Sequence, residues 1–415
     1  MIEIRNKQDC CGCTACVSIC PNNCITMERD AEGFLYPIVN KSACCDCHLC
    51  EKKCPIVGRE KKVAAISEDK YETNRKALQN INQLPQAYVC FNNNNAIREN
   101  STSGGFFSVL AEYVLQKKGI VFGVIINDEH RVIHSFAENE DELMKMRRSK
   151  YVQSEQRGIY PQIKQELLKG RYVLYSGTPC QVAGLKSFLG KDFNTLITVD
   201  VFCHGVGSPA YWDKYVEYMQ DTMKSPIKEI CFREKTYGYN SACLAVYFEN
   251  GKSSHKGHDD DLYWSPFSKN MIYRPSCYAC AFKTVNHVSD YSIGDYWNVN
   301  DFPKEYAAAN GCSLVLCHSK KSEELLHELG VGLSIHEVEL EKALDINGGH
   351  QPSMLIACPA VPELREKWFL KMGECSALEL NRRYLPLSII KRIKCRLKPV
   401  FYRLKILDIF KRKSR

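Results

Sequence analysis

The 415-residue sequence lacks long hydrophobic runs, and no stretch approaches the ~18 to 20 consecutive apolar residues that a membrane-spanning helix needs. Residues 1–6 also lack the apolar core of a secretion signal. These absences predict a cytoplasmic protein. A hydrophobic content of 45% excludes a disordered or fibrous chain, and the length allows more than one buried core.

Cysteine, by contrast, is abundant. The chain has 23 cysteines, and eleven of them lie between Cys10 and Cys54. In a reducing compartment this density favours metal ligands or redox chemistry over disulfides. A segment this short also needs help from a metal to fold, because it cannot build a sufficient core of its own.

The N-terminal segment carries the pattern C-x2-C-x2-C-x3-C-P twice. This spacing is typical of bacterial ferredoxins with two 4Fe–4S clusters, in which the fourth cysteine of each motif binds the other cluster. The first predicted ligand set is Cys10, Cys13, Cys16 and Cys54, and the second is Cys44, Cys47, Cys50 and Cys20. A pair of zinc sites is the alternative, although zinc gives no reason for the repeated spacing.

The other features of this segment fit a ferredoxin half as well. Residues 25–27 and 34–38 flank a turn sequence and predict a hairpin. Cys11, Cys24 and Cys45 are out of register with the motif. We expect them to behave as small buried apolar side chains.

The main part of the chain predicts a partly parallel α/β sheet. Strands are expected at 86–91 and 120–126, with a capped helix between them that begins near Ser101 and ends before Gly119. Residues 170–189 and 195–212 each predict a strand, a tight turn and a helix. The fold class is therefore α+β or α/β, with a dicluster ferredoxin domain followed by a mixed α/β domain.

Four cysteines of the main part have the number and placement expected for the ligands of a third cluster. Cys180 and Cys203 follow strand ends, where open α/β sheets hold their ligands, and Cys277 and Cys280 form a CxxC pair. Together they predict a third 4Fe–4S cluster. Alternatively, Cys180 is a redox thiol, Cys203 is a buried residue and the CxxC pair is structural. The helix start at Cys180 predicts a lowered thiol pKa.

The helix start at 101–105 has free backbone N–H groups and little side-chain bulk, which suits a pyrophosphate. A well-capped structural helix explains the same residues. The segment matches neither GxGxxG nor a P-loop, so the residues alone leave both readings open.

The charge of the chain is concentrated at its C-terminal end. Residues 382–415 hold thirteen Lys or Arg and one acid, so this tail is +12 and the rest of the +8 chain is −4. Leu385, Ile389, Ile390, Ile393 and Leu397 recur at helical spacing and predict a basic amphipathic helix, broken at Pro399. Such a helix suits peripheral contact with the inner membrane face, or it covers the main domain. An acidic body without a reader motif predicts no nucleic-acid partner.

Taken together, the motifs resemble the coenzyme F420 hydrogenase/dehydrogenase beta-subunit family over residues 1–345. The resemblance rests on the ferredoxin-like head, Ser-Gly-Gly-Phe at 103–106, Ser-Lys-Tyr-Val-Gln-Ser at 149–154, Gly-Thr-Pro-Cys at 177–180, Cys-His-Gly at 203–205, the CxxC pair and Ile-Gly-Asp-Tyr-Trp at 293–297. It implies bound FAD and a main-domain 4Fe–4S cluster held by Cys180, Cys203, Cys277 and Cys280. The FAD-binding residues that it implies are Ser101, Thr102, Ser103, Gly104, Gly105, Ser149, Lys150 and Tyr151.

The resemblance implies an iron–sulfur flavoprotein oxidoreductase. It would pass electrons between a two-electron donor or substrate, such as a reduced deazaflavin, at FAD and the 4Fe–4S clusters. A non-catalytic electron-delivery subunit for a partner oxidoreductase and a zinc-stabilised scaffold are the alternatives. His204 and Asp295 lie near the ligand loops as structural residues or proton carriers.

The expected domain organisation follows from these assignments. It comprises a ferredoxin domain at 1–57, a linker at 58–86, a flavin and iron–sulfur domain at 87–350, and a C-terminal extension at 351–415.

Overall fold

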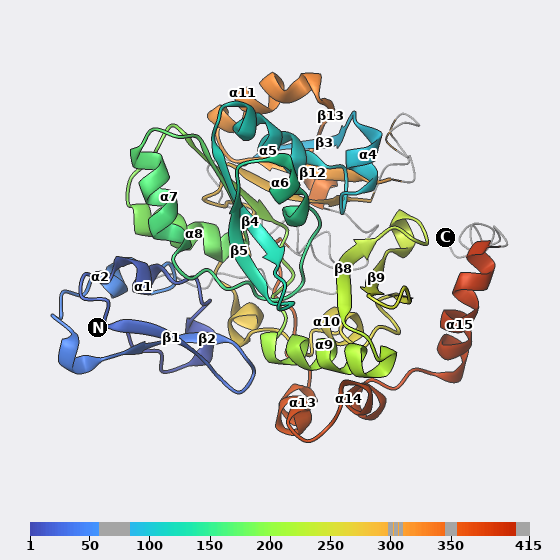
Figure 1. Ribbon diagram of the computed structural model, residues 1–415. Helices are drawn as coiled ribbons and strands as arrows, with labels where there is room; N and C mark the ends of the chain where they lie inside the picture. Colours follow the sequence, from blue (N-terminus) through green and yellow to red (C-terminus); the bar gives the residue numbers. More distant parts are fainter. Residues whose placement is uncertain (58–83, 298–301, 303–305, 307–309, 345–354, 404–415) are drawn as a thin grey trace. The chain divides into compact units, whose positions relative to one another are not determined.

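The computed structural model describes residues 1–57, 84–297, 302, 306, 310–344 and 355–403 (Figure 1). Most of the predicted linker lies outside these residues. The described chain forms two compact units. The first unit combines Met1–Pro209 with Tyr273–Ala360, and the second combines Ala210–Ile272 with Val361–Arg415.

The N-terminal segment of the first unit has the predicted hairpin. Strand β1 (Ile25–Arg29) pairs antiparallel with β2 (Leu35–Val39). Two short helices, α1 (Ala15–Ile19) and α2 (Leu49–Lys52), carry Cys16 and Cys50 respectively. Each cysteine motif therefore wraps around one turn of helix.

An eight-stranded mixed sheet forms the centre of the first unit, in the order β13-β3-β12-β11-β7-β6-β4-β5. The four central strands β11, β7, β6 and β4 are parallel, and the outer pairs are antiparallel. This arrangement confirms the predicted partly parallel sheet. The strands are β3 (Gln86–Asn92), β4 (Ile120–Ile126), β5 (Val132–Ala137), β6 (Val173–Gly177), β7 (Leu196–Val201), β11 (Tyr291–Tyr296), β12 (Cys312–Cys317) and β13 (Leu333–Val338).

Alternate residues of each strand point to opposite faces, so the sheet is covered on both sides. On one face, Val173 and Tyr175 of β6 pack in a core that includes α7 (Ile159–Leu168) and α8 (Pro179–Leu189). On the other face, Leu174 packs in a core that includes α5 (Phe106–Gln116), α6 (Glu140–Met146) and α11 (Lys320–Glu328). Figure 1 shows these helices beside the strands. Both predicted strand–turn–helix segments are confirmed.

The second unit is a three-stranded antiparallel sheet with helices. Its strands are β8 (Ile227–Glu234), β9 (Cys243–Phe248) and β10 (Ser253–Lys256), in the order β10-β9-β8. Its helices are α9 (Pro209–Met223), α10 (Trp264–Ser268), α13 (Arg365–Met372), α14 (Ala377–Tyr384) and α15 (Ile389–Arg403). Helix α15 continues through Pro399, so the predicted break at this proline is wrong.

The remaining helices are short. They are α4 (Asn95–Glu99), α12 (Leu340–Leu344) and the 3-10 turns Lys7–Asp9, Lys41–Ala43, Tyr239–Ser241, Pro275–Ala279 and Leu329–Val331. Within the residues that the structure describes, no helix combines the length and apolar character needed to cross a membrane.

Candidate iron–sulfur and flavin sites

The first thiol group consists of Cys10, Cys13, Cys16 and Cys54. These four cysteines lie together, although Cys54 belongs to the second motif. Burial, together with the neighbouring Cys10 and Cys54 thiols, raises the pKa of the Cys16 thiol to about 12. Cys54 in turn interacts electrostatically with Cys10. Four thiols that repel one another as thiolates fit a metal cluster, because the metal stabilises the charged form.

The second thiol group contains Cys20, Cys44, Cys47 and Cys50. Three of these, Cys20, Cys44 and Cys50, pack in one small core that also contains Cys16, Cys24 and Cys54. The Sγ atoms of Cys20 and Cys24 are 3.3 Å apart. The fourth, Cys47, is exposed, and its neighbour Cys45 has a raised pKa because of a hydrogen bond to it. The structure therefore brings three of the predicted ligands together and places Cys47 on the exposed loop.

Four cysteines from three separate segments line one cavity of the first unit, which we call the main cavity. They form the main-domain thiol group, Cys180, Cys203, Cys277 and Cys280. The cavity encloses about 630 Å³, including its opening to solvent. Burial, opposed by the Lys283 charge and assisted by the neighbouring Cys180 and Cys280, raises the pKa of the Cys203 thiol to about 12.

Secondary structure explains why these four thiols meet. Cys180 begins α8 directly after β6, and Cys203 follows β7, the parallel neighbour of β6. The CxxC pair lies on the 3-10 turn Pro275–Ala279 and just after it. Because parallel strands end at the same edge of a sheet, the first two cysteines are neighbours there. Four convergent, half-buried thiols fit the ligand set of a 4Fe–4S cluster.

The predicted lowering of the Cys180 pKa is wrong. A hydrogen bond with Cys11 raises the pKa of this thiol, and desolvation in the half-buried site raises it further. The helix start was expected to favour the thiolate, but here the effects of the neighbouring thiol and of desolvation are larger.

Several residues around the main cavity were not predicted as site residues. The Lys283 ammonium donates to the Cys203 carbonyl at 2.5 Å and lines the cavity. The Cys358 thiol accepts from the backbone N–H of Cys280 at 3.2 Å. Cys11 lines the cavity as well. These residues carry no spacing signal, because tertiary packing alone brings them to the site.

His204 lines the main cavity and is neutral. Burial lowers the pKa of its imidazole to about 4, and the nearby Lys283 charge acts in the same direction. Asp295 lies on β11 and is not among the described residues that line the cavity.

The two predicted flavin segments meet in the structure. The backbone N–H of Ser149 donates to the Thr102 hydroxyl at 2.9 Å. Ser103 and Gly104 are held by the Ser313 hydroxyl at 3.0 Å each. A Cβ at Gly104 would lie 2.4 Å from the Cys90 carbonyl oxygen, so only glycine fits this approach.

The remaining predicted flavin residues lie beside this junction. Gly105 directly precedes α5, and the Ser101 hydroxyl donates to the Ile97 carbonyl at 2.7 Å. The Lys150 ammonium donates to the carbonyls of Lys145 and Arg147 at the end of α6, and Tyr151 follows it. A glycine-rich helix start next to a basic segment fits an anionic phosphate group.

The first unit combines a mixed β-sheet, a thiol-lined cavity at the ends of its parallel strands and a doubled cysteine motif. These features are typical of an iron–sulfur redox protein. The family comparison gives the particular class. Residues 87–157 match the N-terminal model of the coenzyme F420 hydrogenase/dehydrogenase beta subunit, and residues 170–342 match its C-terminal model. The chain belongs to this family of iron–sulfur flavoprotein oxidoreductases.

Among solved structures, the chain is similar to one chain of the F420-reducing NiFe hydrogenase complex from Methanosarcina barkeri, in a structure obtained with xenon derivatisation. The two share 16% sequence identity, and the match covers 78% of this chain and 97% of that chain with a TM-score of 0.42. No curated protein matches the sequence.

Proposed function

We propose that this chain exchanges two electrons with a small-molecule donor or substrate at FAD and passes them singly to a partner oxidoreductase subunit. The flavin would supply the change from two-electron to one-electron chemistry, and three 4Fe–4S clusters would carry single electrons. A reduced deazaflavin is the donor that the family suggests. Family membership and the doubled cysteine motif support this assignment.

One observation carries the proposal. Cys180, Cys203, Cys277 and Cys280 come from three segments that are far apart in the sequence, yet all four line the main cavity. A packing role does not require four thiols at one cavity. The Lys283 charge lies beside Cys203, where it would stabilise the negative charge of a thiolate-bound cluster.

For FAD, the proposed binding residues are those of the 101–105 and 149–151 segments. The Thr102 hydroxyl is the group that joins them. Thr102→Val removes this hydroxyl and keeps the shape of the side chain. We expect lower flavin content in the purified variant with unchanged iron content. Thr26→Val, on the β1 strand, is the matched control and keeps full flavin.

The proposed activity is tested by mixing the anaerobic, cluster-containing chain with a reduced deazaflavin and recording absorbance spectra over time. We expect flavin bleaching first and iron–sulfur bleaching second. In a Cys277→Ser variant, the first phase should persist while the second slows. Iron–sulfur reduction by one-electron donors alone, with no flavin reduction by any two-electron donor, would instead identify a non-catalytic electron-delivery subunit.

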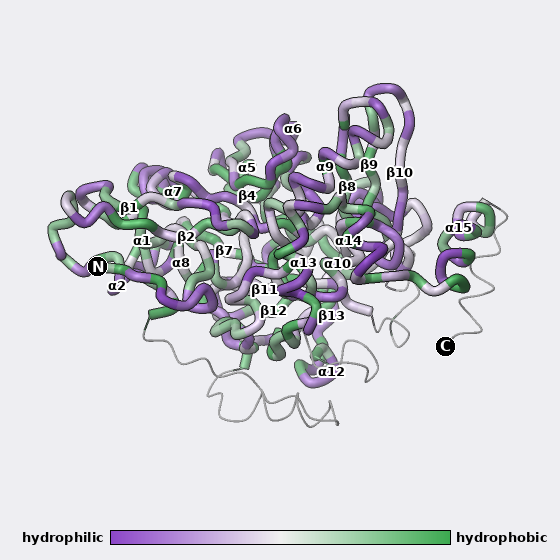
Figure 2. Tube along the Cα trace, turned by 90° about the horizontal axis from the view of Figure 1, so that it is seen from below, coloured by the Kyte–Doolittle hydropathy of each residue, from purple (hydrophilic) through white to green (hydrophobic). Residues whose placement is uncertain are grey.

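Peripheral membrane contact through the C-terminal tail is part of the proposal. Ile389, Ile390 and Ile393 of α15 have exposed side chains between basic residues, and Figure 2 shows hydrophobic and hydrophilic residues alternating along this helix. An exposed apolar face flanked by Lys and Arg suits a surface of anionic lipid.

The test is co-sedimentation of the full chain with vesicles that contain phosphatidylserine. A triple variant, Ile389→Ser, Ile390→Ser and Ile393→Ser, should lose binding, because the charges alone give weak attachment. Vesicles of neutral phosphatidylcholine are the control. Equal sedimentation of the triple variant and the unaltered chain would contradict membrane contact through α15.

A further inference from the structure

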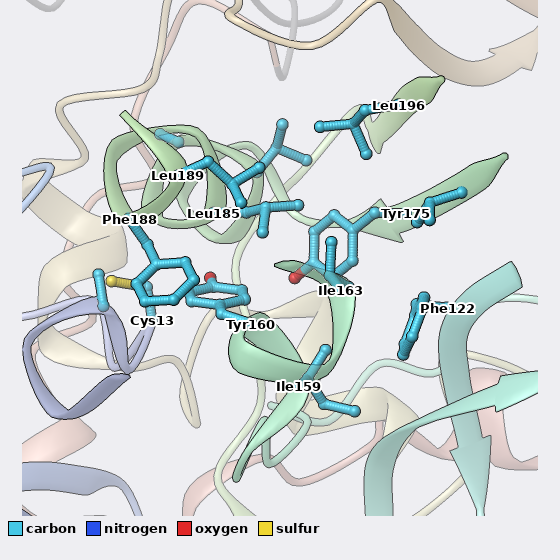
Figure 3. Close-up of a cluster of buried hydrophobic side chains, with 14 of the residues drawn as sticks. Cys13, Phe122, Ile159, Tyr160, Ile163, Tyr175, Leu185, Phe188, Leu189 and Leu196 are labelled. Carbon is cyan, nitrogen blue, oxygen red and sulfur yellow. The ribbon is translucent and has the colours of Figure 1, made fainter. Parts of the chain in front are cut away.

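In the first unit, the Cys10–Cys16 loop of the N-terminal segment lies against helix α8. A Cβ at Gly184 of α8 would lie 2.8 Å from the Cys13 Cβ and 2.9 Å from its Sγ. The loop therefore lies directly on the helix that begins with Pro179 and Cys180. Figure 3 shows Cys13 beside Tyr160 and Phe188 in this buried core.

Cys11 lies between a ligand of the first thiol group and a ligand of the main-domain group. It is buried, and it lines the main cavity together with Cys180. Cys11 and Cys13 belong to one buried core, and Cys180 packs against that core. The Cys11 carbonyl accepts a hydrogen bond from the Gln153 side chain at 2.9 Å, which fixes the backbone here.

Arg274 is a second connection between the same two thiol groups. Its buried guanidinium donates to the Cys10 carbonyl at 2.8 Å and lies 3.6 Å from the Cys10 Sγ. Its own carbonyl accepts from the backbone N–H of Cys277 at 2.9 Å. One residue therefore positions a cysteine of the first group and a cysteine of the main-domain group.

The second thiol group has no such connection among the described residues that line the main cavity. Cys45 occupies the same register in the second motif that Cys11 occupies in the first, but it is exposed. Asp46, Cys47 and His48 are exposed beside it. The two motifs are therefore alike in sequence and different in their surroundings.

We propose that electrons pass between the main-domain group and the first thiol group through the side chain of Cys11, by way of Cys180 and Cys13. The second thiol group, in which Cys47 is exposed, is then the outward terminus. This inference rests on the proposed function and adds the order of the centres to it. Each step moves one electron: the donating centre is oxidised by one unit, the accepting centre is reduced by one unit, and no bond breaks.

Cys11 would serve as a positioning residue. Electron tunnelling weakens steeply across gaps between non-bonded atoms, so a side chain in contact with both ligands shortens the through-space part of the path. Cys11 packs in one core with Cys13 and Cys180 and lines the main cavity, which supplies this bridge. Cys45 is exposed and is not among the described residues that line the cavity.

The test compares Cys11→Ala with Cys45→Ala in the full, cluster-containing chain under anaerobic conditions. A light pulse on a dye generates a one-electron reductant, and absorbance and electron paramagnetic resonance follow how electrons redistribute from the ferredoxin segment to the main-domain centre. This readout needs no substrate, so it stays informative even if the proposed reaction with a two-electron donor fails. We expect Cys11→Ala to slow redistribution several-fold and Cys45→Ala to leave it unchanged.

Iron and flavin contents equal to those of the unaltered chain are required for the comparison. If Cys11→Ala loses iron, Cys11→Ser replaces it, because the serine keeps the shape and hydrogen bonding of the side chain while removing the sulfur. Redistribution at the unaltered rate in the Cys11 variant would overturn the proposal. Equal slowing in the Cys11 and Cys45 variants would overturn it as well.

Discussion

At the scale of single residues, Arg274 shows how a buried charge is accommodated. Its guanidinium donates to the carbonyls of Cys10 and Leu35 and to the Gln153 side chain at 2.8 to 2.9 Å, and it lies 4.3 Å from the Tyr36 ring centroid. Several fixed acceptors replace the water that the guanidinium loses, which offsets the cost of burial.

Replacing Arg274 should therefore destabilise the first unit. Arg274→Met leaves the carbonyls of Cys10 and Leu35 without their donor, and we expect a loss of about 3 kcal/mol in the free energy of unfolding. Arg274→Lys keeps the charge but not the planar fork, so it should recover only part of this loss. Chemical denaturation measures both. Arg5→Met, on an exposed side chain, is the control, and an equal effect there would contradict the account.

The buried His134 side chain makes the stability of the fold depend on pH. Its Nδ1 lies 2.9 Å from the Ser154 hydroxyl and its Nε2 lies 3.1 Å from the Ser176 carbonyl, so a neutral ring that donates through Nε2 satisfies both contacts. Burial lowers the pKa of this imidazole to about 4. The unfolded chain binds a proton near pH 6.5, whereas the folded chain does not until about pH 4.

The direction in which the free energy of unfolding changes with pH follows from this difference in proton binding. The His134 contribution to stability is fully present above the unfolded pKa and is lost as the pH falls toward 4. Between pH 7 and 5 we expect a loss of about 2 kcal/mol in the unaltered chain relative to His134→Gln. Denaturation curves of both proteins at the two pH values provide the measurement. Parallel pH dependence in the two proteins would show that His134 titrates normally.

At the scale of elements, helices α13 and α14 pack against segment 210–272 within the second unit. Trp368 of α13 is fully buried, with its ring centroid 5.2 Å from that of Tyr211 on α9. Asn381 of α14 donates to the Tyr211 hydroxyl at 2.8 Å and to the Leu262 carbonyl at 2.9 Å. The second unit therefore includes helices from beyond residue 360.

Truncating this tryptophan tests that packing. Trp368→Ala should lower the free energy of unfolding of the second unit by about 3 to 5 kcal/mol, because it leaves a large cavity. Leu370→Ala lies on the same helix with a side chain that is 69% exposed, and it should change stability by less than about 0.5 kcal/mol. Thermal melts of both variants provide the comparison. Similar losses in the two would mean that α13 does not pack as described.

Helices and strands could be predicted where the turn residues, caps and apolar periodicity of a segment match its packing in the folded chain. The β1–β2 hairpin, the central parallel strands and helices α5 and α8 all follow from turn residues, apolar periodicity and caps. The sheet β8–β9–β10 was not predicted. The break at Pro399 was expected from the missing backbone N–H of proline, yet α15 continues through that position.

At the scale of the whole molecule, the spacing of the cysteines predicts which thiols lie together. It does not predict the residues that surround them. The four main-domain cysteines were named from strand ends and a CxxC pair, and they line one cavity. The sequence predicts only a small buried side chain at Cys11 and indicates no site role for Lys283 or Arg274. Their roles depend on contacts between residues far apart in the sequence, which no local pattern contains.

We propose that twelve cysteines hold three 4Fe–4S clusters in a chain that also binds FAD. The most direct measurement is the iron, acid-labile sulfide and flavin content of the anaerobically purified chain, beside a Cys203→Ala, Cys277→Ala double variant. We expect about twelve iron and one FAD in the unaltered chain, and about eight iron in the variant. About eight iron in both proteins would contradict the main-domain cluster, and zinc without sulfide would contradict the redox assignment altogether.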